Sequence, residues 1–469
     1  PDAWCTMRAN YHEEHPVDLS AFKAYDIRGR IPDQLNVDLA EQIGLAYAAW
    51  LKPRNVVVGH DIRLTSPELT EAVISGLRKA GVHCHFIGEC GTEEIYFATD
   101  HFEMDGGIMV TASHNPKDYN GMKFVREQSR PVSGDDGLGE IRALVASGQL
   151  NVPANQAQGT RSNLDHRPAY IDHLLQYVDA PSLKPLRIVT NAGHGGAGTV
   201  IDALEPHLPI EFIKIHHEPN GHFPEGVPNP LLIENRAPTI EAIRASKADF
   251  GIAWDGDFDR CFFFDHEGRF IEGYYMVGLL AASFLEREPG AAIAYDPRLT
   301  WNTEDIVREA GGRPIMSKTG HAFFKATLRH ENAIYGGEMS AHHYFRDFAS
   351  CDSGMIPWLL VAEMMSKRDQ SLAELVDARM ARYPASGEIN RKVEDASATI
   401  SEIRAAFEGD AEGVDTTDGI SLSFADWRFN LRMSNTEPVI RLNVESRGDV
   451  SLMEERTEML LGMIGGDLA

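Results

Sequence analysis

The sequence predicts an α/β protein built from several domains. Three strand, turn and helix units of one kind begin near residues 55, 186 and 291, far apart in the chain. Such repetition favours several domains of the same topology. The C-terminal region differs, since its predicted strands alternate apolar and polar residues and precede a single helix. With 469 residues, the chain also exceeds what one hydrophobic core usually supports, so we expect about three or four domains.

The first repeated unit shows why each element is expected. Residues 55–59 form a short apolar run that suits a buried strand. After it, Thr65 or Ser66 can cap a helix, Pro67 fits its first turn, and Gly81 marks its end. We therefore predict one β-strand followed by one α-helix.

The same motif returns in a second unit. Asp-x-Arg-Leu-Thr stands at residues 61–65 and again at residues 296–300, each time after an apolar strand and before a helix. The second helix is expected to end at Gly311 and Gly312. The shared spacing predicts that the two units occupy matching places in two similar domains.

A third unit carries a glycine-rich loop that permits a different function. Its strand spans residues 186–190, and residues 193–198 then fit GxGxxG before a helix that starts at Thr199. Glu218 lies at roughly the distance where an acid would bind a ribose. An NAD(P)-dependent oxidoreductase is therefore the alternative class. A glycine-rich turn is also typical of a simple tight connection, and nothing nearby supplies hydride chemistry.

A hydroxyl at the end of a buried strand is the first candidate for chemistry. Residues 106–111 suit a covered strand, and Asn115 with Pro116 forces a turn that leaves Ser113 at the strand's carboxyl end. Open α/β sheets bind ligands at this end, although Ser113 also fits an ordinary turn. The flanking residues lack the glycines of a hydrolase nucleophile elbow. His114 is expected to point away from Ser113, because neighbouring side chains on an extended chain face opposite sides.

The strongest local signal is acidic. Asp255, Asp257 and Asp259 alternate between two apolar strands, and Arg260 follows them directly. In an extended segment, residues two apart share a side, so the three carboxylates are expected to converge on one hard cation. The surrounding spacing does not fit a calcium-binding EF-hand loop. Because Mg²⁺ takes few protein carboxylates and completes its shell with water and phosphate oxygens, a phosphorylated hydroxyl would be a fitting partner.

Three further loops hold polar groups suited to an anionic or hydroxylated ligand. Residues 22–30 place basic side chains beside a glycine, where backbone and guanidinium can approach an anion. Residues 336–342 offer donors and acceptors for sugar hydroxyls, and residues 317–321 form a second polar loop near them in sequence.

The C-terminal region adds a fourth loop of this kind. Strands are predicted at residues 420–424, 429–432 and 439–444, with a helix near residues 451–463. Between two of these strands, residues 432–438 bring together one guanidinium, two hydroxyls and an amide. Such a set suits a phosphate, because a dianion binds best to several charge-assisted donors at once.

Charge, cysteine usage and hydropathy limit the cellular setting. The formal net charge of -26 argues against a nucleic-acid or acidic-membrane partner, which needs clustered Lys and Arg. The five cysteines show no CxxC spacing or histidine pairing, so we expect reduced thiols and a cytoplasmic protein. The apolar run at residues 274–285 is too short to span a bilayer and suits a core helix. Residues 1–20 are expected to form a flexible leader.

Five motifs, taken together and in this order, resemble the α-D-phosphohexomutase family and, within it, its bacterial phosphomannomutase branch. They span nearly the whole chain and stand at residues 25–29, 111–116, 255–260, 336–342 and 432–438. The resemblance implies three similar α/β domains followed by a C-terminal α+β domain similar to the TATA-box-binding-protein fold. The corresponding boundaries, after the leader 1–20, are residues 21–162, 163–266, 267–384 and 385–469.

The resemblance also assigns the reacting groups. Ser113 would be the phosphoserine, and one Mg²⁺ would be held by an oxygen of its phosphate together with Asp255, Asp257 and Asp259. The cations around the transferring phosphoryl group would be Arg28, Lys123 and Arg260. The general base would be Lys123 or His342.

The remaining matched residues would bind the substrate. Glu338 and Ser340 would read sugar hydroxyls. The non-reacting phosphate would be held by Arg432, Ser434, Asn435 and Thr436. The positions that match residues facing the family's cleft are Arg298, His321 and His342.

The implied reaction interconverts mannose 6-phosphate and mannose 1-phosphate, with glucose phosphates as further substrates. Phosphorylated Ser113 would give its phosphate to the sugar, and the resulting hexose 1,6-bisphosphate, which also serves as activator, would turn end for end. A phosphosugar is the expected partner of a monomer or weak dimer, and the product would feed nucleotide-sugar and polysaccharide synthesis.

Overall fold

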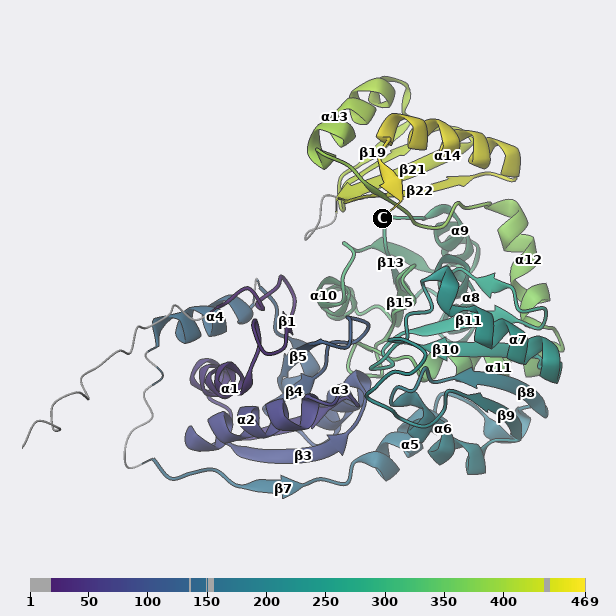
Figure 1. Cartoon of the computed structure of the whole chain (residues 1–469). Helices are drawn as coiled ribbons and strands as arrows, with labels where there is room; N and C mark the ends of the chain where they lie inside the picture. Colours follow the sequence, from purple (N-terminus) through teal and green to yellow (C-terminus); the bar gives the residue numbers. More distant parts are fainter. Residues whose placement is uncertain (1–17, 135, 149, 151–155, 434–438, 469) are drawn as a thin grey trace, which may run out of the picture.

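Four β-sheets, each covered by helices, divide the described chain into four domains (Figure 1). The structure is a computed structural model that describes residues 18–134, 136–148, 150, 156–433 and 439–468. Most of the predicted leader therefore lies outside the described residues. The predicted domain boundaries at residues 162, 266 and 384 remain a prediction.

Domain I is built on the sheet of order β1-β5-β4-β2-β3-β7, with β6 paired to β5. Its strands are β1 (Ile27–Arg30), β2 (Asn55–His60), β3 (His83–Glu89), β4 (Gly106–Val110), β5 (Tyr119–Arg126), β6 (Arg130–Pro131) and β7 (Arg161–Asn163). Its helices are α1 (Val37–Leu51), α2 (Ser66–Lys79), α3 (Thr92–His101) and α4 (Leu138–Ser147). The predicted first unit is confirmed as β2 followed by α2.

Domain II has the strand order β12-β11-β10-β8-β9. Its strands are β8 (Leu186–Asn191), β9 (Ile210–Ile215), β10 (Phe250–Trp254), β11 (Cys261–Asp265) and β12 (Phe270–Ile271). Its helices are α5 (Arg167–Leu175), α6 (Ala197–Leu204) and α7 (Ala237–Ser246). The helix expected from Thr199 thus begins two residues earlier.

Domain III has the strand order β14-β13-β15-β16-β17. Its strands are β13 (Ala292–Tyr295), β14 (Arg313–Met316), β15 (Tyr335–Gly337), β16 (His343–Phe345) and β17 (Cys351–Asp352). Its helices are α8 (Gly273–Arg287), α9 (Trp301–Glu309), α10 (His321–Glu331), α11 (Ile356–Arg368) and α12 (Leu372–Arg382). Most of α8 is buried, which confirms the predicted core helix.

The first three sheets share one topology, as the repeated sequence units predict. In each, the first strand of the unit lies between the second and third strands and is parallel to both. The third strand then pairs antiparallel with the fourth. The sets are β2 with β3, β4 and β5; β8 with β9, β10 and β11; and β13 with β14, β15 and β16. The loops after β4, β10 and β15 therefore occupy the same place in three domains, and these loops carry Ser113, the three aspartates and Glu338.

The three domains also share packing. One continuous cluster of buried apolar side chains includes Met109 of domain I, Trp254 of domain II and Tyr335 of domain III. A buried acid reinforces this interface, because Glu93 at the start of α3 accepts hydrogen bonds from the Tyr170 hydroxyl at 2.5 Å and the Gly354 amide at 2.6 Å. The relative positions of the three site loops are thus fixed by a common core.

Domain IV has a separate core and an antiparallel sheet of order β19-β20-β21-β22-β18-β23. Its elements are β18 (Ile389–Lys392), α13 (Ala396–Phe407), β19 (Gly413–Asp415), β20 (Ile420–Ser423), β21 (Trp427–Met433), β22 (Val439–Ser446), α14 (Val450–Ile464) and β23 (Asp467–Leu468). The three predicted strands and the last helix are confirmed, whereas β18 and α13 were not predicted. In Figure 1 this domain lies beyond domain III, with both helices on one face of the sheet.

Two general expectations can be compared with the described residues. Cys84, Cys90, Cys261 and Cys351 are free thiols and are buried. Among the described helices, none combines the length and apolar character that a membrane crossing requires.

Candidate active site

Ser113 lies at the carboxyl end of β4 and faces domain II. Its side chain is buried, and its hydroxyl donates a hydrogen bond of 2.7 Å to Oδ2 of Asp255. The backbone φ at Ser113 is 47°, in the left-handed region that residues other than glycine seldom adopt. The loop thus holds the hydroxyl against a carboxylate of another domain.

The expected separation of Ser113 and His114 is wrong. Their Oγ and Nδ1 atoms lie 3.1 Å apart, because the left-handed backbone at Ser113 breaks the alternation of an extended chain. The same Nδ1 atom accepts from Nη2 of Arg260 at 2.6 Å. Burial and the Arg260 charge together hold the pKa of His114 well below its usual value. A neutral imidazole in this position accepts from the guanidinium.

Asp255, Asp257 and Asp259 converge as predicted, but on a turn and not along an extended strand. Carboxylate oxygens of the three lie within 4.8 Å of one another. The turn between β10 and β11 places Phe258 at a φ of 45°, and its ring is fully buried. The Phe258 ring lies beside Gly91 and Gly196, so its packing holds the turn that carries the aspartates.

The glycine-rich loop at residues 193–198 packs against this turn. A Cβ atom on Gly195 would lie 2.8 Å from the Gly256 carbonyl oxygen, and one on Gly196 would lie 3.0 Å from the Phe258 ring. The glycines therefore permit close contact between two loops of domain II. This packing accounts for them without a dinucleotide.

Lys123 lies against two of the three aspartates. Its Nζ atom is 2.7 Å from Oδ2 of Asp257 and 2.5 Å from Oδ2 of Asp259. Burial favours the neutral amine, but the two carboxylate charges outweigh burial and raise the pKa of Lys123. Thr92 at the start of α3 also donates to Oδ2 of Asp257, at 2.5 Å. Sequence reasoning missed Thr92, which no motif marks.

Two guanidinium groups complete the cationic lining. Arg260 donates to Oδ2 of Asp255 through Nε at 2.9 Å and Nη2 at 2.7 Å. Arg28 is held by Asp26 at 2.8 Å and by the Asn115 side chain at 2.9 Å. Both arginines thus flank the loop that bears Ser113.

The three aspartates fit a divalent cation with hard oxygen ligands. Oδ1 of Asp257 and Oδ1 of Asp259 are buried and have no hydrogen-bond partner among the described residues. Mg²⁺ binds through carboxylate oxygens and fills its remaining positions with water or phosphate. Asp255, Asp257 and Asp259 are the residues that would hold it.

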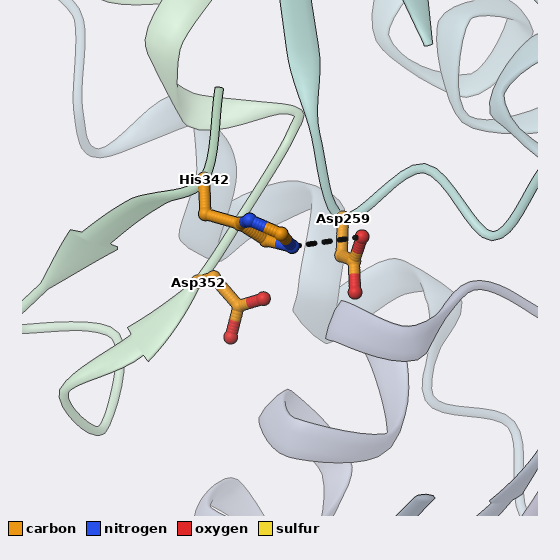
Figure 2. A group of neighbouring side chains, drawn as sticks. All are labelled: Asp259, His342 and Asp352. Atoms are coloured by element: carbon orange, nitrogen blue, oxygen red, sulfur yellow. Dashed lines mark ion pairs between the residues drawn. The ribbon is translucent and has the colours of Figure 1, made fainter. Parts of the chain in front are cut away.

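The loop after β15 meets the turn that carries the three aspartates through the backbone. Arg260 and His342 form an antiparallel bridge, and Nε2 of His342 lies 3.6 Å from Oδ1 of Asp259. Figure 2 shows the His342 ring beside both Asp259 and Asp352. Burial lowers the pKa of His342, but the contact with Asp259 and the charges of these acids outweigh burial and raise the pKa. Asp352 itself pairs with Lys325 at 2.8 Å, and neither residue was predicted.

Glu338 is fixed by its own domain. Its Oε1 accepts from the Gly320 amide at 2.9 Å and its Oε2 from the Tyr344 hydroxyl at 2.6 Å. Ser340 lies 3.4 Å from Nη2 of Arg298 through its hydroxyl. The loop at residues 317–321 therefore lies beside the loop at residues 336–342, as needed for a common binding site.

Arg298 and Arg432 meet at one carboxylate between domains III and IV. Nη2 of Arg432 lies 2.8 Å from Oε2 of Glu388, and Nη1 of Arg298 lies 3.5 Å from the same oxygen. The three positive neighbours Arg298, Arg432 and Arg441 outweigh burial and hold the pKa of Glu388 near 2. Glu388 was not predicted. Ser434, Asn435 and Thr436 lie outside the described residues.

His321 ends the loop at residues 317–321 and begins α10. Its Nδ1 atom is buried without a hydrogen-bond partner in the described structure. Burial, followed by the charges of Lys325 and Lys123, holds the pKa of His321 well below its usual value. A neutral imidazole here retains one acceptor and one donor.

A buried hydroxyl that faces carboxylates of another domain and is ringed by Lys and Arg defines a site for phosphoryl transfer, which needs positioning and charge neutralisation above all. Comparison with known families agrees. The chain matches the phosphoglucomutase/phosphomannomutase alpha/beta/alpha domains I, II and III over residues 19–151, 168–268 and 272–383, and the C-terminal domain over residues 388–462. It belongs to the phosphoglucomutase/phosphomannomutase family.

Individual relatives cover the whole length. The chain is 59% identical to the phosphohexose mutases of Xanthomonas campestris pv. campestris (strain B100), over 96% of this chain and 100% of that protein. It is 60% identical to a phosphomannomutase of Salmonella typhimurium, over 95% of this chain and 99% of that protein. A Burkholderia thailandensis phosphoglucomutase/phosphomannomutase family structure aligns with a TM-score of 0.84 and 31% identity, over 96% of this chain and 98% of that one. The oxidoreductase alternative finds no support.

Proposed function

We propose that the chain interconverts mannose 6-phosphate and mannose 1-phosphate, and the matching glucose phosphates, through phosphorylated Ser113. The observation that carries the proposal is the 2.7 Å hydrogen bond from the Ser113 hydroxyl to Asp255 inside the triad of buried aspartates. Relatives named phosphomannomutase at 58–60% identity support mannose as the sugar.

The transfer step exchanges one P–O bond for another. A hydroxyl oxygen of the bound sugar phosphate attacks the phosphorus of phosphorylated Ser113, the Oγ–P bond breaks, and Oγ remains as the serine oxygen. Arg28, Lys123 and Arg260 neutralise charge on the transferring group. Mg²⁺, held by Asp255, Asp257 and Asp259, supplies further charge neutralisation when it is bound.

The attacking hydroxyl loses a proton to a general base. Lys123 and His342 are the two candidates, and both lie against Asp259. Because Lys123 lies between two carboxylates that raise its pKa, we assign it the role of cation and proton donor. The pKa of His342 is raised as well, but an imidazole starts from an ordinary pKa far below that of an amine, so His342 is the candidate that accepts the proton.

Substrate binding falls to domains III and IV. Glu338 and Ser340 would contact the sugar hydroxyls O3 and O4, with Arg298 and His321 beside them. Arg432, together with Ser434, Asn435 and Thr436, would hold the phosphate that does not react. The binding site for the non-reacting phosphate and the position of Ser113 are both fixed. The 1,6-bisphosphate can therefore bind between them in either orientation. The same bisphosphate, added from outside, would phosphorylate Ser113 and so activate the enzyme.

The test is sugar choice. Mannose and glucose differ at C2, and a site that reads O3 and O4 does not separate them. An inverted C4 hydroxyl, as in galactose, leaves a buried partner unpaired, which costs about 1–3 kcal/mol, or roughly 5- to 150-fold in kcat/KM. We expect similar kcat/KM for mannose and glucose 1-phosphates, and a value lower by that factor for galactose 1-phosphate.

The variant Ser340→Ala provides the matched comparison in the same assay. It should narrow the gap between mannose and galactose 1-phosphates, because one partner of the ring hydroxyls is gone. Equal turnover of all three sugars by the wild-type protein would eliminate the reading of O4. Absence of any mutase activity with mannose and glucose phosphates would overturn the proposed function.

A further inference from the structure

One buried guanidinium binds the backbone of the loop that carries Ser113. Arg63 is 2% exposed. Its Nη1 atom donates to the carbonyl oxygens of Pro116 at 2.8 Å and Tyr119 at 2.9 Å, and its Nη2 atom donates to those of Ser113 at 2.8 Å and Asn115 at 2.6 Å. All four acceptors belong to the segment 113–119. The four N–H donors of the two Nη atoms are therefore all used on the loop backbone.

Asp61 contacts both Arg63 and the residues that lead into the same loop. Its Oδ1 accepts from the Arg63 amide at 3.0 Å and its Oδ2 from the Thr111 hydroxyl at 2.7 Å. The Thr111 hydroxyl in turn accepts from the Ser113 amide at 2.9 Å. Side chain and backbone of the nucleophile loop are therefore tied to residues 61–63.

These contacts hold Ser113 in a backbone conformation that serine does not adopt readily. With φ at 47°, Ser113 lies in a region that persists only where the surroundings hold it. This conformation directs Oγ at Asp255. Domain II closes over the arginine, since the Phe223 ring centre lies 5.5 Å from Cζ of Arg63. The guanidinium is thus enclosed at the joint between the two domains that form the reacting site.

The repeated motif supports a loop-holding role for the aspartate. In domain III, Asp296 occupies the place of Asp61 and accepts from the Arg298 amide at 2.9 Å and from the Met339 amide at 2.7 Å. Met339 belongs to the loop after β15, which corresponds to the Ser113 loop after β4. Both arginines pair with the aspartate of their own motif, Arg63 with Asp61 at 3.3 Å and Arg298 with Asp296 at 2.7 Å. They differ in their other partners, because Arg298 also lies 3.5 Å from Glu388 at the interface with domain IV.

We propose that Arg63, supported by Asp61, is the positioning residue of the nucleophile. It holds the carbonyl groups of residues 113–119 so that Ser113 keeps its left-handed backbone. The Ser113 hydroxyl therefore stays directed at Asp255, in the position from which phosphoryl transfer takes place. It acts through the loop and touches neither phosphate nor sugar. The inference rests on the proposed role of Ser113 as the phosphorylated residue.

The test separates phosphoryl transfer from substrate binding. In Arg63→Lys, an ammonium keeps the charge but cannot span four carbonyl oxygens. We expect phosphorylation of Ser113 by glucose 1,6-bisphosphate, measured in a single turnover by quenched-flow mass spectrometry, to slow by about 100-fold, as a displacement of about 1 Å does. The dissociation constant of glucose 1-phosphate, measured by calorimetry, should stay unchanged because domains III and IV bind it. Amide hydrogen exchange at residues 113–119 should become faster.

A second variant and a matched control complete the design. Asp61→Asn removes one acceptor and should slow phosphorylation about tenfold, the effect of one ordinary hydrogen bond. Arg329 is also a guanidinium bound to backbone carbonyls, but none of them belongs to the segment 113–119; its acceptors are Lys325, Gln128, Ser129 and Ala349. Arg329→Lys should leave the phosphorylation rate unchanged.

The phosphorylation rates and the hydrogen exchange together decide whether Arg63 positions the loop. Wild-type phosphorylation rates in both Arg63→Lys and Asp61→Asn would overturn the inference, as would an equal loss in Arg329→Lys. If the wild-type protein gains no phosphate on Ser113, the proposed function fails, and hydrogen exchange still decides whether Arg63 holds the loop: faster exchange in Arg63→Lys supports it, and unchanged exchange refutes it.

Discussion

Replacing Lys123 with methionine removes the positive charge that faces the buried aspartates. Lys123 is 7% exposed, and its Nζ lies 2.7 Å from Asp257 and 2.5 Å from Asp259. Breaking a buried ion pair by removing one partner costs about 3–5 kcal/mol. For a folding unit of this size, about 2 °C accompanies each kcal/mol, so we expect Tm in metal-free buffer to fall by roughly 6–10 °C.

Mg²⁺ should reverse part of that loss. An ion that binds only the folded state adds about 2.7 kcal/mol at 100 times its dissociation constant. In Lys123→Met no ammonium competes for Asp257 and Asp259, so Mg²⁺ should raise the Tm of the variant more than that of the wild-type protein. Calorimetric titration with Mg²⁺ should likewise give tighter binding to the variant. Both readouts are independent of catalysis.

Lys214 offers a matched control on the surface of domain II. Its Nζ also lies 2.7 Å from two carboxylates, those of Asp202 and Glu205. Because exposed ion pairs contribute about 0–1 kcal/mol, Lys214→Met should lower Tm by no more than about 2 °C, with no dependence on Mg²⁺. Equal shifts in the two variants, or a Lys123→Met protein that Mg²⁺ stabilises no more than wild type, would refute a metal site at the three aspartates.

Three other predictions concern the nucleophile, the phosphate grip and a buried acid. Ser113→Ala should abolish mutase turnover with Tm nearly unchanged, because it alters a loop and not a core; near-normal activity in protein free of wild type would rule out Ser113. Arg432→Ala should raise KM for mannose 1-phosphate while Ser113 is still phosphorylated by the bisphosphate, and unchanged kinetics would exclude the grip. Glu93 is buried and its pKa is raised to about 8, so its contribution to stability is complete below the unfolded pKa near 4.5 and is lost as pH rises through about 8. The stability of wild type relative to Glu93→Gln should therefore fall by about 1.4 kcal/mol per pH unit between about pH 5 and 8, and a difference that stays constant across this range would contradict the raised pKa.

Most of the architecture follows from local sequence patterns. Apolar runs before Ser113 and Asp255 mark the two strands whose carboxyl ends carry these residues. The two Asp-x-Arg-Leu-Thr motifs reveal the repeat by their matching context. Position at a strand end is a local property, because the turn that ends the strand is written in the next few residues. The repeated topology was predictable for this reason, whereas the grouping of the site loops was implied only by the family resemblance.

Side-chain partners far apart in the sequence were not predictable in the same way. Thr92 and Arg63 lie in α3 and after β2, yet they act on Asp257 and on the loop at residues 113–119, and no local pattern reports such contacts. Backbone conformation was the other limit. An extended chain was assumed at Ser113, but its φ of 47° brings His114 to the hydroxyl. Strand β18 of domain IV, Ile389–Lys392, was not predicted because it is short and mostly polar.

The most direct test of the account is intact mass spectrometry of the purified protein before and after incubation with glucose 1,6-bisphosphate and Mg²⁺. We predict a gain of one phosphoryl group, located on Ser113 by peptide mapping, and its removal when mannose 6-phosphate is added. A phosphate on another residue, or a protein that turns over mannose phosphates without ever carrying a phosphoryl group, would contradict the phosphoserine mechanism.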